Sequence, residues 1–488
     1  MPFNSLKFLL FLPVVYLFFR FAGERARLSV LLAASLLFYA ALNVPYLLVV
    51  LALITMVTYG FGIWIERAES PKTKCTVLWS GIAVNILVLV TMRYLPFLAQ
   101  NITALSTALS LGINVQPVKA FVAIGVSFYV FQAISYLIDI YLEIEKPELN
   151  FGYFALYMSF FPKLLQGPIE RSGDLLPQLK QTYKFDYDNL REGLLQFFWG
   201  LLKKVVIADQ LAVMVNPVYD NVYAYKGLPL ILATYYFALQ IYFDFSGYSD
   251  MALGTARVFN IKLTQNFNNP YFSRSIADFW RRWHISFSRW ILDYIFKPVQ
   301  ISLRTWKTWG TVSALIVTFL VSGLWHGASW TFVVWGLLHG FYLSCSVVYK
   351  PIQKTLHGYF NIRNDNPFLR IWQIFFTFNL TCFAWIFFRS NNIHDAIYVV
   401  KNLLHWVNIR DLINIKSSVY IGNSAFMFKV VMLYSLAIIV SDNIYKHNVA
   451  KVTLTQKRYI SWPIIYLIIF SSIVLGNFDN YSFIYNRF

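Results

Sequence analysis

Apolar runs separated by short polar stretches follow one another along most of the 488-residue chain. Most of these runs approach or exceed the ~17 to 25 apolar residues with which a helix crosses a bilayer. The pattern therefore predicts an all-α, polytopic membrane protein with about 11 to 12 transmembrane helices. The predicted spans are Leu6–Phe21, Leu28–Val44, Tyr46–Ile65, Thr76–Met92, Phe121–Leu142, Leu194–Val215, Leu228–Leu253, Thr311–Gly327, Trp330–Tyr349, Ile371–Phe388, Phe426–Val440 and Ile460–Leu475.

Two further apolar segments, Phe151–Leu165 and Trp283–Phe296, are too short to span comfortably, and we expect them to be re-entrant or interfacial helices. Neither an internal repeat nor a soluble domain interrupts the pattern. Residues 1–488 are therefore expected to form a single integral membrane domain.

Composition excludes several other classes of protein. Hydrophobic residues make up 58% of the chain and charged residues only 13%, whereas soluble domains are about one quarter charged. The net charge of +18 would fit nucleic-acid binding only if the basic residues clustered on a soluble fold, and here they lie between apolar runs. Cys75, Cys345 and Cys382 have no paired spacing, so neither a disulfide framework nor a metal site is expected.

Much of the positive charge lies in one segment. Nine basic residues and two acidic residues occur between Arg257 and Lys307, which contributes +7. By the positive-inside rule this segment should face the cytoplasm.

His326 ends an apolar run that holds no other ionisable group. A histidine at membrane depth is either a hydrogen-bonded packing residue or a functional base. Gly323 and Gly327 would let a substrate or another backbone approach closely, and they equally form a small-residue motif for helix packing. The residues themselves leave both interpretations open.

His284 lies in a segment rich in tryptophan and arginine. If residues 279–290 form one helix, Trp280, Trp283, Phe287 and Trp290 make an aromatic stripe, and Arg281, His284 and Ser288 occupy another face. One interpretation is an interfacial helix that Trp and Arg anchor to the membrane. The other is a cationic, histidine-bearing face at the mouth of a channel, which would hold a phosphate-bearing donor.

His339 follows His326 by 13 residues, which places it about 220° further round a continuous helix. The two histidines cannot share a face unless the chain breaks near Gly327. We interpret His339 as a packing or lining residue.

A polar island at Tyr242–Asp250 contains Asp244, Tyr248 and Asp250. Six residues separate the carboxylates, or about 240° on a helix, so a catalytic dyad is disfavoured. A cavity wall, a helix break or an ion pair with the basic segment is the better interpretation. The sequence contains neither a glycine-rich phosphate-binding loop nor a His-Glu-x-x-His motif, so nucleotide hydrolysis and zinc proteolysis are not supported.

Over nearly its whole length, the chain resembles the membrane-bound O-acyltransferases, especially the bacterial alginate O-acetyltransferase type. It is also similar to peptidoglycan O-acetyltransferases and to the membrane proteins of teichoic acid D-alanyl transfer. The stretches that carry the resemblance are residues 3–13, Gly125–Tyr129, Phe161–Lys163, Gly167–Arg171, Lys203–Val205, Tyr242–Met251, Phe279–Ser288 and Leu324–Gly327.

The resemblance implies a ring of tilted helices around a central funnel, with His326 deep in a tunnel that connects the two membrane faces. It matches His326 to the catalytic histidine of the family and His284 to a second active-site position. One difference bears on the acceptor. Alginate-type members have a glycine-containing turn after the residues that match Asp293–Phe296, whereas this chain continues with Lys297–Ser302.

The resemblance thus implies an O-acyltransferase in the bacterial cytoplasmic (inner) membrane. It would move an acetyl group from a cytoplasmic thioester, acetyl-CoA or an acyl carrier, to hydroxyls of an extracytoplasmic polysaccharide or to an accessory acetyltransferase that relays it. No tightly bound cofactor is expected, and the partners are these substrates and membrane lipids, without nucleic acid. Beside the catalytic pair His326 and His284, we assign the donor site or channel to Arg281, Arg282, Trp283, Ser288, Asp244, Tyr248, Asp250 and Trp325.

Two alternatives remain at this stage. Within the family, the acyl group could be D-alanine destined for a teichoic acid-like polymer. Outside the family, a transporter or flippase for a glycan precursor would also use many spans and intramembrane acids, although the inverted repeats typical of that class are not apparent in this chain.

Overall fold

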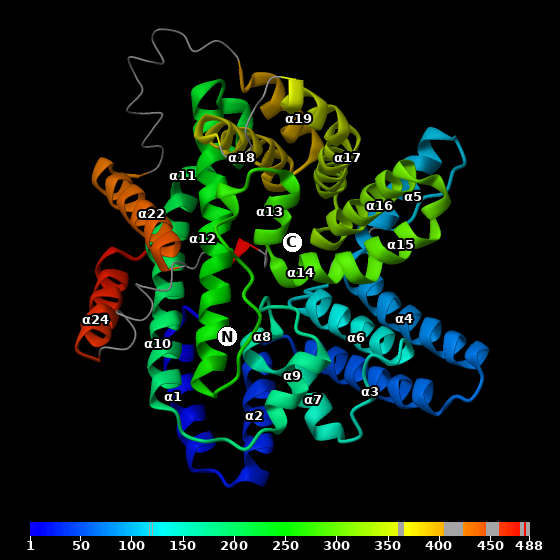
Figure 1. The fold of residues 1–488 in the computed structure, drawn as a ribbon, viewed down its shortest axis with the longest axis vertical. Helices are drawn as coiled ribbons and strands as arrows, with labels where there is room; N and C mark the ends of the chain where they lie inside the picture. The colour runs from blue at the N-terminus through cyan, green and yellow to red at the C-terminus, as the bar shows by residue number, and fades with distance from the viewer. Residues whose placement is uncertain are drawn as a thin grey trace. The chain divides into compact units, whose positions relative to one another are not determined.

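The computed structural model describes residues 1–116, 118–119, 121–359, 366–404, 423–445, 458–478 and 483–484. Helices dominate these residues and no β-strand occurs among them, which confirms the all-α prediction (Figure 1). The chain divides into two compact units. Unit 1 comprises Met1–Phe197 and Tyr248–Thr264, and unit 2 comprises Phe198–Gly247 and Gln265–Phe488.

Unit 1 is built around three helices that pack side by side, α3, α4 and α6 (Figure 1). Serine and proline mark the start of α4, because Ser70 accepts a hydrogen bond from the Thr73 N–H and Pro71 is the first helical residue. The helices of this unit are α1 (Leu6–Phe21), α2 (Glu24–Ala40), α3 (Pro45–Arg67), α4 (Pro71–Arg93), α5 (Leu95–Ala108), α6 (Val126–Tyr141), α7 (Phe151–Ser159), α8 (Phe161–Leu164), α9 (Ser172–Lys180) and most of α10 (Tyr187–Leu202).

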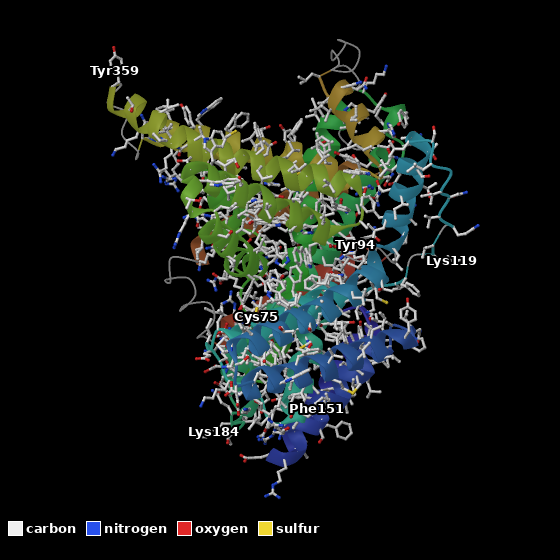
Figure 2. The ribbon with its side chains drawn as sticks, turned by 90° about the vertical axis from the view of Figure 1, so that its right-hand side faces the viewer. Cys75, Tyr94, Lys119, Phe151, Lys184 and Tyr359 are labelled. Atoms are coloured by element: carbon white, nitrogen blue, oxygen red, sulfur yellow. The ribbon has the colours of Figure 1, made fainter. Side chains whose placement is uncertain are left out.

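Unit 2 contains the remaining helices, both long and short. They are α11 (Asp209–Tyr219), most of α12 (Leu228–Val258), α13 (Ile276–Arg282), α14 (Ile285–Ile291), α15 (Lys297–Ser302), α16 (Thr308–His326), α17 (Trp330–Tyr359), α18 (Pro367–Arg389), α19 (Ile393–Asn402), α22 (Ala425–Tyr445) and α24 (Arg458–Leu475). Single π-helical turns occur at Lys203–Ala208 and Leu292–Phe296. α16 and α17 pack closely, and Figure 2 shows Tyr359 at the far end of α17.

Six helices in the described part of the chain are long and apolar enough to cross a membrane. They are α3, α4, α12, α16, residues Trp330–Thr355 of α17, and α18. Val126–Tyr141, Ala425–Val440 and Ile460–Leu475 are shorter apolar helices. The chain is therefore a multi-pass membrane protein, as predicted. The remaining predicted spans are helical over most of their length, although α1 and α2 have only 16 and 17 residues and α2 carries charges in its first turn.

Several helix boundaries differ from the prediction. The span predicted at Leu194–Val215 is a longer run formed by α10, a π-helical turn and α11. The short segment Phe151–Leu165 is broken at Phe160, between α7 and α8. Neither α5 nor α9 was predicted. All three cysteines are free thiols, and Figure 2 shows Cys75 on α4.

Candidate active site

A break in the chain places His284 between two short helices. α13 ends at Arg282 and α14 begins at Ile285, and His284 itself has the left-handed backbone angles φ 42° and ψ 57°. Residues 279–290 therefore do not form the single helix on which the aromatic stripe depended. For a residue other than glycine this conformation costs about 1–2 kcal/mol, and such strained residues concentrate at functional sites.

Two backbone hydrogen bonds hold this break. The Asn268 N–H donates to the Arg282 carbonyl at 2.9 Å, and the Ile285 N–H donates to the Asn266 carbonyl at 3.0 Å. One extended segment thus pairs with the chain on both sides of His284. These hydrogen bonds to a segment outside α13 and α14 stabilise the left-handed backbone of His284. Hydrophobic periodicity alone cannot predict them.

The backbone strain at His284 predicts an unusual order of stability among substitutions. Because glycine adopts positive φ without penalty, we expect His284→Gly to unfold at a higher temperature than His284→Ala, by the equivalent of about 1 kcal/mol. The matched control is Ser288, inside α14. There Ser288→Gly should be less stable than Ser288→Ala by about 1 kcal/mol. Thermal unfolding of the four purified variants in detergent measures both differences, and the same order at both sites would contradict a strained His284.

The His284 ring lies in a fully buried aromatic environment. Its centroid is 4.8 Å from that of Phe245, 5.0 Å from Phe287 and 5.9 Å from Trp325. His284 is outside the six candidate membrane-spanning helices. Burial lowers the pKa of its imidazole well below its usual range, because the charged form loses its hydration. The ring is therefore neutral at neutral pH.

His326 is the last residue of α16 and is also buried. Its ring centroid lies 4.8 Å from that of Trp335 on α17, 5.2 Å from Phe388 on α18 and 5.6 Å from Phe287 on α14. Phe287 also stacks on Trp325, with 4.3 Å between the ring centroids. The two predicted histidines thus contact the same phenylalanine. The structure brings His284, Trp325 and His326 into one cluster, as expected of a shared site.

Gly323, three residues before His326, packs closely against α17, as Gly336 does against α16. A Cβ atom on Gly323 would lie 2.3 Å from the Phe332 carbonyl oxygen, and one on Gly336 would lie 2.2 Å from the Phe319 carbonyl oxygen. Such contacts are far shorter than van der Waals distance, so only glycine permits this approach of α16 to α17. This agrees with the small-residue packing motif. The close approach brings Trp335 against the His326 ring.

His339 also packs on Trp335, with 4.9 Å between the ring centroids. The chain does break at Gly327, so both histidines contact Trp335. The Trp280 indole N–H donates to Nδ1 of His339 at 3.2 Å. Since an indole can only donate, Nδ1 must accept, and the proton of this ring is on Nε2. His339 is a buried packing residue, consistent with its interpretation from sequence.

The remaining residues predicted around His284 do not form an aromatic stripe. Trp283 is 1% exposed and packs on Trp385 at 5.1 Å between ring centroids. Trp280, by contrast, faces His339 and Trp335. The Ser288 hydroxyl donates to the Trp283 carbonyl at 3.0 Å. Burial of Trp283 also disagrees with a membrane-interface anchor.

The two arginines of the predicted donor site have different surroundings. Arg281 is exposed, and its Nε donates to the Ala277 carbonyl at 3.2 Å. Arg282 is partly exposed and pairs with Asp278, with 2.9 Å between Nε and Oδ1. Both lie at the end of α13, close in sequence to His284.

The polar island lies within the unbroken helix α12, which rules out the helix break that was one of the three interpretations. Asp244 does form an ion pair, which was one of the interpretations from sequence. Its partner, however, is Lys204 at 2.6 Å and not a residue of the basic segment. Lys204 also pairs with Asp209 at 2.7 Å, and the Ile484 N–H donates to Asp244 at 2.8 Å. These charged side chains are all buried.

Tyr248 and Asp250 belong to unit 1. The Tyr248 ring stacks on Phe3, with 4.9 Å between centroids, and Gln196 donates to Asp250 at 3.3 Å.

Sequence reasoning missed several residues of the site. Phe245 contacts His284, and Trp335 and Phe388 contact His326. Aromatic residues are so frequent in this chain that none of the three stood out in the sequence. In the described residues, no three His, Cys, Asp or Glu side chains gather as metal ligands.

The fold and the site together define a class of protein. It is a multi-pass helical membrane protein in which two buried histidines share one aromatic cluster. The chain belongs to the membrane-bound O-acyltransferase family, whose model matches residues 144–390, including both histidines. The transporter alternative is therefore not supported, and the protein is an O-acyltransferase.

Named relatives cover most of the chain. A "probable alginate O-acetylase" of Pseudomonas putida is 36% identical over 81% of this chain and 79% of its own length. A "peptidoglycan O-acetyltransferase" of Helicobacter pylori is 34% identical over 77% of this chain and 73% of its own. A "teichoic acid D-alanyltransferase" of Bacillus subtilis is 28% identical over 56% of this chain and 69% of its own.

Proposed function

We propose that this enzyme transfers an acetyl group from a cytoplasmic acyl thioester, with acetyl-CoA as the first candidate, to hydroxyls of an extracytoplasmic polysaccharide or to a partner protein that relays the group. The site of action would be the bacterial cytoplasmic membrane. The names of the relatives at 34% and 36% identity, an alginate O-acetylase and a peptidoglycan O-acetyltransferase, support acetyl as the acyl group and a cell-envelope glycan as the acceptor.

The observation that carries the chemical part of the proposal is the contact of Phe287 with both His284 and His326. His326 would act as general base and take the proton of the attacking hydroxyl. The oxygen then forms a bond to the thioester carbonyl carbon, the carbon–sulfur bond breaks, and the leaving thiolate receives the proton from His326.

His284 would assist this step as a neutral hydrogen-bond donor. The carbonyl oxygen of the thioester gains negative charge as the new bond forms, and a donor that is already positioned in a dry site stabilises that charge. Complete burial of the His284 ring and the neutral state of its imidazole suit this role. The acyl thioester is consumed as a substrate, so the proposal needs no resident cofactor.

Arg282 is proposed to attract the anionic phosphates of the donor. We expect Arg282→Ala to raise the apparent KM for acetyl-CoA about tenfold, the equivalent of one charge-assisted hydrogen bond, with little change in kcat. Arg289→Ala is the matched control, because Arg289 is exposed on the neighbouring α14. Initial rates against acetyl-CoA concentration measure the effect. Equal KM values for Arg282→Ala and Arg289→Ala would count against a donor-binding role.

The acceptor is tested by deletion of the gene and mass spectrometry of the cell-surface glycans. We expect the loss of acetyl groups, each a mass of about 42 Da, from one polymer, and their return with the wild-type gene. Unchanged acetylation of every surface glycan would exclude the proposed acceptor class.

The similarity to a teichoic acid D-alanyltransferase favours a second candidate, in which D-alanine is the transferred acyl group. The same comparison of glycans separates the two candidates, because a D-alanyl ester adds about 71 Da and carries a titratable amine.

A further inference from the structure

One asparagine connects the segment before α13 to the start of α14. Asn266 is buried, and its Oδ1 accepts two hydrogen bonds from Ser286, from the backbone N–H at 3.1 Å and from the hydroxyl at 2.7 Å. Its own carbonyl accepts the Ile285 N–H at 3.0 Å. A single residue therefore receives three donors from the two residues that follow His284.

These contacts replace the cap that α14 would otherwise need. The first N–H groups of a helix have no partner within it, and the residue before the helix usually satisfies one with its side chain. Here that residue is His284, which makes no such bond. Asn266 satisfies the N–H groups of Ile285 and Ser286 from a different segment, so the His284 side chain does not have to serve as the cap.

The same contacts hold the strained backbone of His284. Asn266 holds Ile285 and Ser286, the two residues that follow His284, and Asn268, two residues further along the chain, holds Arg282 on the other side of the break. A left-handed residue persists only where its surroundings impose that conformation. The direction of the imidazole ring, and with it the contact to Phe287, depends on this backbone.

We propose that Asn266 is a positioning residue for acyl transfer, which sets the orientation of His284 through Oδ1 and its backbone carbonyl. The inference rests on the proposed role of His284 in the reaction. Displacement of a reacting or stabilising group by about 1 Å can reduce a rate by about 10²-fold. Asn266→Ala should therefore lower kcat by about 10²-fold, with KM for acetyl-CoA changed much less.

The isosteric variant Asn266→Asp provides a rescue. Nδ2 of Asn266 is buried without a hydrogen-bond partner among the described residues, so replacing it by oxygen removes no described protein hydrogen bond. The carboxyl group keeps an acceptor for both Ser286 donors. We expect Asn266→Asp to retain kcat within about fivefold of the wild type. If Asn266→Asp is as inactive as Asn266→Ala, the acceptor oxygen at this position does not determine kcat, and the proposal is wrong.

A double-mutant cycle separates positioning from a general effect on the fold. Steady-state kcat is measured for His284→Ala, Asn266→Ala and the double variant, each purified in detergent as the full chain. If Asn266 acts through His284, Asn266→Ala has no further effect once the imidazole is absent. An additional drop of about 10²-fold in the double variant would contradict the inference.

Failure of this inference is distinguishable from failure of the proposed function. Full activity of His284→Ala would remove His284 from the reaction, and the positioning role of Asn266 with it. A strong loss in His284→Ala together with full activity of a correctly folded Asn266→Ala would overturn the inference alone.

Discussion

Replacement of His326 by alanine should abolish measurable acyl transfer while the protein still accumulates in the membrane. General base catalysis contributes about 10²- to 10⁴-fold to a rate, and alanine offers no group that could take the hydroxyl proton. His326→Gln should be equally inactive, because the amide has a similar extent and polarity but is not a base. Rates of acetyl transfer by matched amounts of purified protein measure the effect.

The control for this prediction is another histidine of the same chain. His394 is exposed on α19, and His394→Ala should keep the wild-type rate. Acetyl transfer by a folded His326→Ala protein at more than about one tenth of the wild-type rate would show that His326 is not the base.

Loss of Lys204 should produce the largest loss of stability among the substitutions considered. Its ammonium group pairs with both Asp209 and Asp244, and all three side chains are buried. Removal of one partner from a buried ion pair leaves an uncompensated charge and typically costs about 3–5 kcal/mol. We therefore expect Lys204→Met to lower the free energy of unfolding by about that amount.

A surface ion pair gives the matched control. Lys297 pairs with Asp293 at 2.6 Å, but its side chain is 57% exposed. Such pairs are worth about 0–1 kcal/mol, so Lys297→Met should unfold nearly as the wild type does. Thermal unfolding in detergent compares the two variants. Equal stability of Lys204→Met and Lys297→Met would contradict the buried cluster.

The parts of the fold that hydrophobic periodicity determines could be predicted from the sequence. Long apolar runs predict membrane helices because lipid imposes both length and composition on them. His326 was identifiable for the same reason, since an ionisable residue in an apolar run is costly and therefore conspicuous. His284 was identified largely through the resemblance to the family.

The break at His284 could not be predicted from the pattern of residues. Residues 279–290 have an acceptable helical periodicity, and what prevents a continuous helix is a set of hydrogen bonds to Asn266 and Asn268, which precede α13. Likewise, the pairing of Asp244 with Lys204 could not be predicted, because residues far apart in the sequence show no local pattern that reveals their contact. The hydrogen bonds of Asn266 and Asn268 hold the backbone on both sides of His284.

Transfer of radiolabelled acetyl groups from acetyl-CoA to polymer by isolated membranes tests the proposed reaction most directly. Membranes that contain the wild-type enzyme and its native glycan should incorporate label into alkali-labile esters of the polymer. Membranes with equal amounts of His326→Ala should incorporate none above background. Equal labelling in the two preparations, or an unlabelled polymer in wild-type membranes that demonstrably contain acceptor, would contradict acetyl transfer by His326.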